Sequence, residues 1–307
     1  MKINEVYKLS DQPLILASTG IANWPKLKNP GSGKAYLLVH PMWQFSWTSL
    51  RLYHKLSRQL KKNGIDMILL HNSQEEYQFA KSFGFRSYLI NQNIHACEHN
   101  FTIRPELEKK YEAVYIAAAK KYKRIHLAEK VERLFIVTYF WPDIRDENGF
   151  WDLYGFEPRI KHACFNKERI PSIEVSHILN QSDCGLALSK KEGAMWASME
   201  YLLTGLPIVT TPSVGGRDFF FDDRFVIKVK DHPAAVNEGV QEMSYRQLDP
   251  YLIREETLKK ITAYREKFYD LCASLALEEA LVSSFPTYKE FAEHVWAGKG
   301  IYKLKIM

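Results

Sequence analysis

Two glutamates eight residues apart, Glu192 and Glu200, are the residues in this sequence whose type and spacing most clearly suggest chemistry. They lie in residues 189–218, SKKEGAMWASMEYLLTGLPIVTTPSVGGRD, which we predict as a strand end, loop, helix, strand and loop. Ligands of open α/β sheets bind at the carboxyl ends of strands, where helix N-termini offer N–H groups to phosphates. A carboxylate at such a turn stays ionised and accepts hydrogen bonds from sugar hydroxyls.

The helix and the second loop of this segment add two details. If the helix begins near Ala194, Glu200 lies almost two turns into it, on a face distinct from the apolar residues that cover the sheet. The second loop holds Gly215 and Gly216, which would let the backbone approach a ligand closely.

The whole segment resembles the E-x7-E signature of retaining family 4 glycosyltransferases, which have the GT-B fold. Order and spacing agree over residues 189–218, and an unrelated doubly wound protein is the alternative. The matching parts are residues 186–189, Glu192 with Gly193, Glu200, residues 205–209, and Gly215 with Gly216.

The resemblance implies a role for each matching residue. Glu192 would be catalytic, contacting the donor sugar near its reacting face, and Glu200 would hold the ribose hydroxyls of the nucleotide. The alternatives are an N-cap carboxylate for Glu192 and a solvated helix residue for Glu200. Residues 195–197 and 217–218 depart from the family pattern, which leaves the donor sugar open. The backbone that would line the sugar and diphosphate belongs to Gly193, Ala194, Met195 and Trp196.

A second match lies upstream, in residues 115–127, which look like the first strand and loop of the family's nucleotide-binding half. The family carries an arginine and a lysine there. Lys123 fits the lysine and is the second predicted catalytic residue, whereas alanines stand at the arginine position. Arg124, or a neighbouring lysine, would compensate, because a leaving diphosphate needs fixed cations when no metal takes part. The alternative is a solvated basic loop.

Polar residues of the first half follow predicted strands and are expected to face a cleft. His40 follows residues 35–39, and Asn93 and His95 follow residues 87–90. GT-B relatives often place such a loop against the donor sugar. The alternative is that these are exposed loop histidines.

These residues must be positioned by alternating strands and helices, which indicate parallel β-α-β units. The predicted fold is α/β, of the GT-B class, with two Rossmann-like domains facing a cleft and an abbreviated first domain. We expect the domains at residues 1–104 and 105–307, with the terminal helices packing back on the first. A helix is predicted over residues 124–131 and a strand over 161–164.

Net charge, cysteine spacing and the length of the apolar runs limit the kinds of partner and compartment that we expect. The 307 residues carry a net charge of +6, which suits an anionic small ligand or an anionic membrane surface. Dispersed cations argue against nucleic acid, and we expect those around Lys123 to matter most. The four cysteines show neither disulfide nor zinc spacing. The longest apolar runs are too short to span a bilayer, so we expect a cytoplasmic protein, peripheral to membranes at most.

The sequence therefore predicts a retaining, metal-independent glycosyltransferase without a cofactor. Its partners would be a nucleotide-sugar donor and a saccharide or lipid-linked saccharide acceptor. Two alternatives stay open: a non-catalytic subunit that binds a nucleotide-sugar, and a nucleotide-sugar epimerase, which would need no acceptor.

Overall fold

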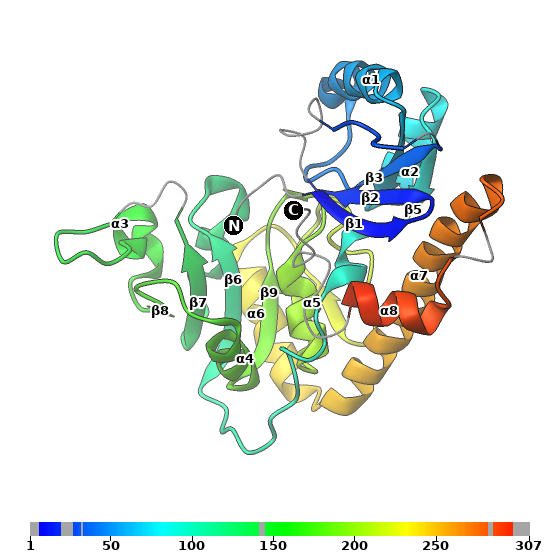
Figure 1. Ribbon diagram of the computed structural model, residues 1–307. Coiled ribbons are helices and arrows are strands. Elements are labelled where there is room, and N and C mark those ends of the chain that lie inside the picture. Colours follow the sequence, from blue (N-terminus) through cyan, green and yellow to red (C-terminus); the bar gives the residue numbers. More distant parts are fainter. Residues whose placement is uncertain (1–5, 20–26, 32, 141–144, 282–284, 297–307) are drawn as a thin grey trace. The chain divides into compact units, whose positions relative to one another are not determined.

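The structure, a computed structural model, describes residues 6–19, 27–31, 33–140, 145–281 and 285–296 (Figure 1). The chain divides into two compact units. Unit 1 is discontinuous and consists of residues 1–97, 215–219 and 260–307, and unit 2 consists of residues 98–214 and 220–259. The last part of the chain therefore groups with the first.

Unit 1 contains a five-stranded sheet in the order β1-β2-β3-β4-β5. β1 and β2 form an antiparallel hairpin, which the apolar pattern of the sequence did not predict, and the other neighbours are parallel. Parallel neighbours need a crossover, which α1 provides between β3 and β4 and α2 between β4 and β5. The bounds are β1 Val6–Asp11, β2 Leu14–Ser18, β3 Ala35–Val39, α1 Trp47–Lys62, β4 Ile65–His71, α2 Gln74–Ser82 and β5 Ser87–Leu89.

The core of unit 1 follows from these periodicities. β3 is buried along its whole length, as a central parallel strand covered on both faces should be. α1 turns Tyr53, Leu56 and Leu60 toward the sheet and exposes its other face. The short helix η2 (Gln92–His95), the later part of α7 (Pro250–Glu278) and α8 (Tyr288–Trp296) complete the unit.

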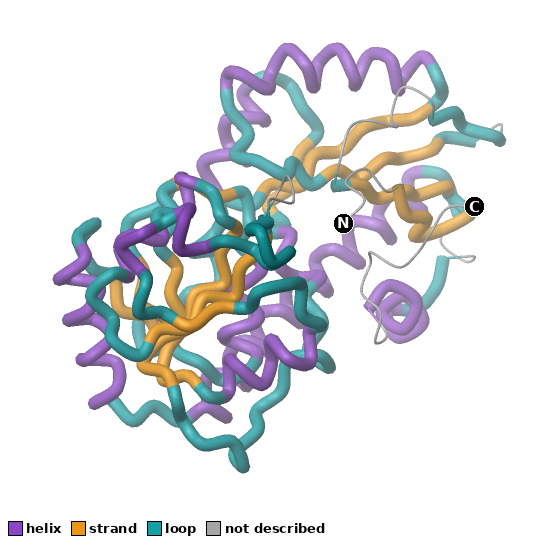
Figure 2. The backbone as a smooth tube through the Cα atoms, turned by 90° about the vertical axis from the view of Figure 1, so that its left-hand side faces the viewer, coloured by secondary structure: helices purple, strands orange, loops and turns teal. Residues whose placement is uncertain are grey.

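Unit 2 contains a six-stranded parallel sheet in the order β13-β11-β9-β6-β7-β8, with helices around it (Figure 2). β10 and β12 form a separate two-stranded sheet. The strands are β6 Tyr111–Ala118, β7 Leu134–Tyr139, β8 Cys164–Phe165, β9 Ser182–Ala187, β10 Lys191–Glu192, β11 Ile208–Thr210, β12 Val214–Gly215 and β13 Val226–Lys228. The helices are η3 Lys121–Lys123, η4 Ile125–Ala128, α3 Leu153–Phe156, η5 Pro158–Ile160, α4 Ser172–Asn180, α5 Trp196–Leu203 and α6 Pro233–Tyr245.

Two predicted elements differ from the structure. Residues 124–131 do not form a continuous helix, because Arg124 has left-handed dihedral angles (φ 53°, ψ 42°) that separate the short helices η3 and η4. The strand predicted over residues 161–164 is reduced to β8, since η5 and a turn precede it. Among the described residues, no helix combines the length and apolar character that crossing a membrane requires.

Replacing Gly185 with alanine should destabilise unit 2 by about 2–3 kcal/mol. A Cβ atom at Gly185, in the middle of β9, would lie 2.4 Å from the Tyr201 ring. That ring cannot simply move, because its buried hydroxyl accepts a 2.7 Å hydrogen bond from the Ile116 N–H. Urea unfolding measures the change. Gly33→Ala is the control, since nothing lies within 4 Å of its Cβ position. Equal midpoints for the two variants would contradict the prediction.

Candidate active site

Lys123 and Glu192 form a buried ion pair in unit 2. The Lys123 ammonium donates to Glu192 Oε1, and the two residues are only 7% and 6% exposed. Lys123 ends the loop after β6, and Glu192 lies in β10, shortly after β9. β6 and β9 are parallel neighbours, so their carboxyl ends meet at one edge of the sheet. The two predicted catalytic residues are therefore brought together although they are 69 positions apart.

The backbone on the lysine side of this pair is fixed by a core tyrosine. The Tyr115 hydroxyl donates to the backbone carbonyl of Lys123 over 2.5 Å. Tyr115 is fully buried in the middle of β6. The ammonium of Lys123 is thus carried by a segment that is tied to the central sheet.

Two tyrosines that the sequence analysis did not single out share this region. Withdrawal from water, followed by the negative charge of Glu192, raises the pKa of Tyr122. The Tyr139 ring is half-exposed, yet withdrawal of its hydroxyl from water and the charges of Glu192 and Glu200 raise its pKa. The charges of both predicted glutamates therefore raise the pKa of the same phenol, that of Tyr139. Tyr139 directly follows the predicted strand over residues 134–138, and that position was the signal that could have found it.

Glu200 lies in the middle of α5 and is partly buried. Burial raises its pKa to about 7, so a large share of this carboxyl is protonated at neutral pH. It is therefore not the fully solvated helix residue considered from the sequence. A carboxyl with this pKa responds to any ligand whose hydroxyls donate to its charged form.

The residues between the two glutamates form the entrance to α5. Met195 is the N-cap residue and is buried, and Ser198 donates to its carbonyl through both its N–H and its hydroxyl. Gly193 is also buried, whereas Ala194 and Trp196 are partly exposed. The first turn of α5 follows Glu192 closely in the chain, so the positive end of a helix belongs to this region.

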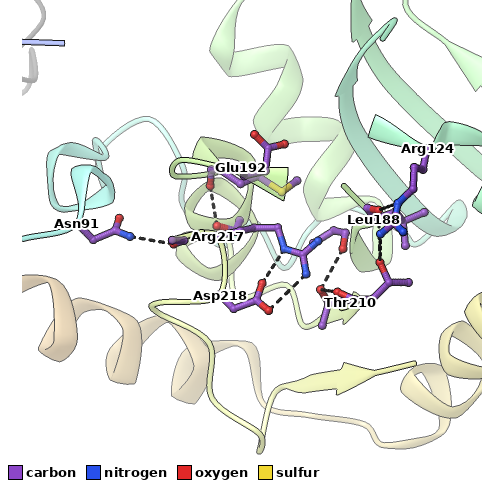
Figure 3. Close-up of polar contacts among 12 residues, drawn as sticks. Asn91, Arg124, Leu188, Glu192, Thr210, Arg217 and Asp218 are labelled. Carbon is purple, nitrogen blue, oxygen red and sulfur yellow. Dashed lines mark hydrogen bonds and ion pairs between the residues drawn. The ribbon is translucent and has the colours of Figure 1, made fainter. Parts of the chain in front are cut away.

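Arg124 uses all three guanidinium nitrogens within unit 2, and Figure 3 shows its contact with Leu188. Nε donates to the Leu188 carbonyl over 2.6 Å, Nη2 to Thr211 Oγ1 over 2.8 Å, and Nη1 lies 2.7 Å from Asp231 Oδ2. These partners follow β9, β11 and β13, so Arg124 joins the ends of three strands. In this structure the guanidinium holds the sheet edge together, and its predicted contact with a diphosphate stays a prediction.

The two predicted glycines belong to the segment of unit 1 over residues 215–219, and Gly215 is the last residue of β12. Gly215 has a φ of +105°, a conformation that favours glycine. A Cβ atom at Gly216 would lie 2.3 Å from Asn72 Cβ. Asn91 Nδ2 donates to the carbonyls of Gly216 and Asn72, over 2.9 Å each (Figure 3). The close approach at Gly216 is therefore to the chain itself.

His40, Asn93 and His95 are all buried in unit 1, so the alternative of exposed loop histidines is wrong. The Trp296 indole N–H donates to His95 Nδ1 over 3.0 Å. Because an indole nitrogen only donates, we assign the His95 proton to Nε2, which lies 3.3 Å from His40 Nε2. Burial lowers the pKa of His40 to about 3 and that of His95 well below its usual value, so both rings are neutral at pH 7.

Within the part of the chain that the structure describes, no three His, Cys, Asp or Glu side chains form a group that could hold a metal ion. The expectation that no metal or cofactor takes part stays a prediction.

Comparisons with known proteins identify the fold. No protein-family model matches the chain, and no curated protein matches it in sequence. Among solved structures, TarM is similar with a TM-score of 0.59 and 14% identity, over 86% of this chain and 55% of TarM. A mutant of S. aureus TarM in complex with fondaparinux, alpha-GlcNAc-glycerol and UDP is similar with a TM-score of 0.60 and 14% identity, over 86% and 56%. Sucrose-phosphate synthase from Thermosynechococcus elongatus gives 0.51 and 13%, over 75% and 63%.

These similarities confirm the α/β GT-B fold that the sequence predicted. The chain spans about half the length of TarM. At these identities the comparison shows the fold alone.

Proposed function

We propose that this chain is a glycosyltransferase that transfers a sugar from a nucleotide-sugar to a saccharide acceptor, lipid-linked saccharides included. We further propose that the reaction retains the anomeric configuration and needs no metal. The observation that carries the proposal is the buried Lys123–Glu192 pair at the carboxyl edge of the unit 2 sheet. The UDP and alpha-GlcNAc-glycerol bound by the TarM mutant, which has this fold, are the kinds of ligand that the pair suits.

The positive charge of Lys123 and the negative charge of Glu192 have different roles in the proposed transfer. When the bond between the anomeric carbon and the diphosphate oxygen breaks, its electron pair leaves on the diphosphate, and the Lys123 ammonium stabilises that charge. The sugar ring becomes positive, which the Glu192 carboxylate stabilises. The acceptor hydroxyl then forms the new bond on the same face, and its proton passes to the departing diphosphate. Without a donor, the two charges neutralise each other.

The nucleotide affinity should rise by up to about tenfold as the pH rises from about 6 to 8, because of Glu200. Its pKa is about 7 in the free protein, and ribose hydroxyls donate to the ionised form, so binding lowers that pKa. Calorimetric titration of wild type and Glu200→Gln isolates this effect, because titration of the phosphates is common to both. The same pH dependence in the two proteins would remove Glu200 from the ribose site.

The same carboxyl predicts a stability change that needs no ligand. Between pH 4.5 and 7 the folded chain keeps a proton on Glu200 that the unfolded chain releases, so this group destabilises the fold as pH rises. Glu200→Gln should stabilise the protein by about 2 kcal/mol at pH 8, after allowance for partial exposure, and hardly at pH 4.5. Thermal unfolding at both values measures the difference, and stabilisation confined to pH 4.5 would contradict it.

A panel of UDP-, GDP- and ADP-sugars tests the proposed activity. We expect slow hydrolysis of one donor, faster turnover with a saccharide acceptor, and product of the same anomeric configuration. Nucleotide binding without turnover would favour the non-catalytic alternative. That alternative is motivated by an alanine, Ala118 or Ala119, at the family's arginine position and by the three contacts that already engage the Arg124 guanidinium. Conversion of the donor into an isomeric nucleotide-sugar without an acceptor would identify an epimerase.

A further inference from the structure

The net charge of the chain is concentrated in one stretch. Residues 27–97 hold nine lysines and arginines against three carboxylates, and this difference equals the +6 of the whole chain. Outside that stretch, acidic and basic residues balance. The excess of positive charge therefore belongs to unit 1, and the functional importance expected for the cations around Lys123 stays a prediction.

Five of those nine cations lie on α1, which contains no acidic residue. Arg51, Lys55, Arg58 and Lys62 are spaced by four, three and four positions, so they form one row along the helix, and Lys61 lies beside it. All five are exposed, and no ion pair engages any of them among the described residues. We call these five side chains, together with the exposed Trp43, Trp47 and Leu52, the α1 surface.

The apolar part of the α1 surface is large and exposed. Trp47, the first residue of α1, is 68% exposed, and Trp43 in the preceding loop is 58% exposed. Leu52 adds a further apolar side chain at 41%. The Trp47 ring contacts Phe79 and Phe83 edge-on, with ring centroids 5.1 and 4.9 Å apart. These two contacts hold the exposed indole in place. Exposed aromatic groups of this kind mark interaction surfaces.

The orientation of α1 is fixed by its other face. Tyr53, Leu56 and Leu60 are buried against the unit 1 sheet, so the row of cations cannot turn inward. The helix thus presents its basic and aromatic groups on a rigid support, and nothing has to unfold or reorient before a partner contacts them.

We propose that the α1 surface binds an anionic lipid membrane from one side. A row of cations on a helix without acidic residues is attracted to anionic headgroups. Each lysine or arginine near the membrane surface raises the affinity about fivefold. Indole rings and a leucine beside that row fit the headgroup level, where their apolar parts leave water. A nucleic acid or an acidic polysaccharide would use the cations but leave the aliphatic Leu52 in water, so the lipid surface is the better match. This inference concerns unit 1 alone and stands apart from the proposed activity.

Sedimentation with sucrose-loaded vesicles tests the proposal. We expect the wild type to bind vesicles of phosphatidylcholine with about one third phosphatidylglycerol, to bind pure phosphatidylcholine at least tenfold more weakly, and to lose anionic binding in high salt. Changing Arg51, Lys55, Arg58 and Lys62 together to glutamine should weaken anionic binding by about a hundredfold or more. Trp47→Ala should weaken it by about fivefold, because an exposed indole is lost.

A control variant removes the same number of exposed cations from unit 2, through Lys110→Gln, Lys161→Gln, Arg169→Gln and Lys228→Gln. Equal loss in both quadruple variants would overturn the proposal, since net charge alone would then explain binding. Equal binding to both lipids, or binding to heparin or RNA without binding to vesicles, would overturn it as well. Circular dichroism shows whether the variants fold, and nucleotide affinity, measured in parallel, reports separately on the proposed activity.

Discussion

Glu192→Gln should slow sugar transfer by about a thousandfold and leave nucleotide affinity within about threefold of the wild type. Glutamine keeps the size of the side chain and an oxygen that accepts from the Lys123 ammonium, so the hydrogen bond is retained while the buried ammonium loses its counter-charge, which lowers stability. What disappears is the negative charge that would stabilise the sugar as it becomes positive. The effect therefore belongs to the turnover number. Initial rates with the active donor, together with calorimetric nucleotide binding, measure both quantities.

The matched control for this variant is Glu129→Gln, the same change at a more exposed carboxylate of unit 2 that lies 3.7 Å from Arg159. It should leave the transfer rate unchanged. If Glu192→Gln retains wild-type turnover, Glu192 is not catalytic, and its carboxylate serves only the ion pair with Lys123, since Met195 and not Glu192 is the N-cap residue of α5.

Lys123→Met should slow transfer by about a hundred- to a thousandfold and should also weaken binding of the nucleoside diphosphate by at least about tenfold. Affinity for the nucleoside should be retained, because the ammonium is assigned to the diphosphate and not to the ribose or base. Lys121→Met is the control, since Lys121 belongs to the same short helix but is exposed. Parallel losses of nucleoside and nucleotide binding would show that the change disrupts the site as a whole.

Stability must be followed in the same variant. Removing Lys123 leaves the Glu192 carboxylate buried without its cation, which costs about 3 kcal/mol or more. The double variant Lys123→Met with Glu192→Gln should recover most of that stability yet stay inactive. This pattern separates the role of the pair in folding from its role in transfer.

The sequence was informative where burial imposes a pattern. The apolar runs of β3, β6 and β9 are readable because parallel strands are covered on both faces. The family resemblance assigned Lys123 and Glu192 to one site, and the structure brings them together because loops after parallel neighbouring strands share an edge. The strand order brings the two charges close enough to pair, whereas their separation of 69 positions in the sequence does not predict the ion pair.

Other features depend on contacts that no local pattern contains. The left-handed backbone of Arg124 lies at the start of the helix predicted over residues 124–131, of which only the short helix η4 forms, and the three partners of its side chain come from residues 188, 211 and 231. His40 and His95 follow strands as loop residues do, yet they are buried, because Phe268 and Trp296 from the end of the chain pack against His95. The residues near those histidines in the sequence do not predict that Phe268 and Trp296 bury them.

The discontinuity of unit 1 has a consequence for synthesis on the ribosome. The His95–Trp296 hydrogen bond joins residues 201 positions apart, so at about 5–20 residues per second its two partners emerge roughly 10–40 s apart. Unit 2 lies between them in the chain and can complete its sheet during that interval. Unit 1 is started first and finished last, and until α8 emerges its nascent core offers apolar surface to chaperones.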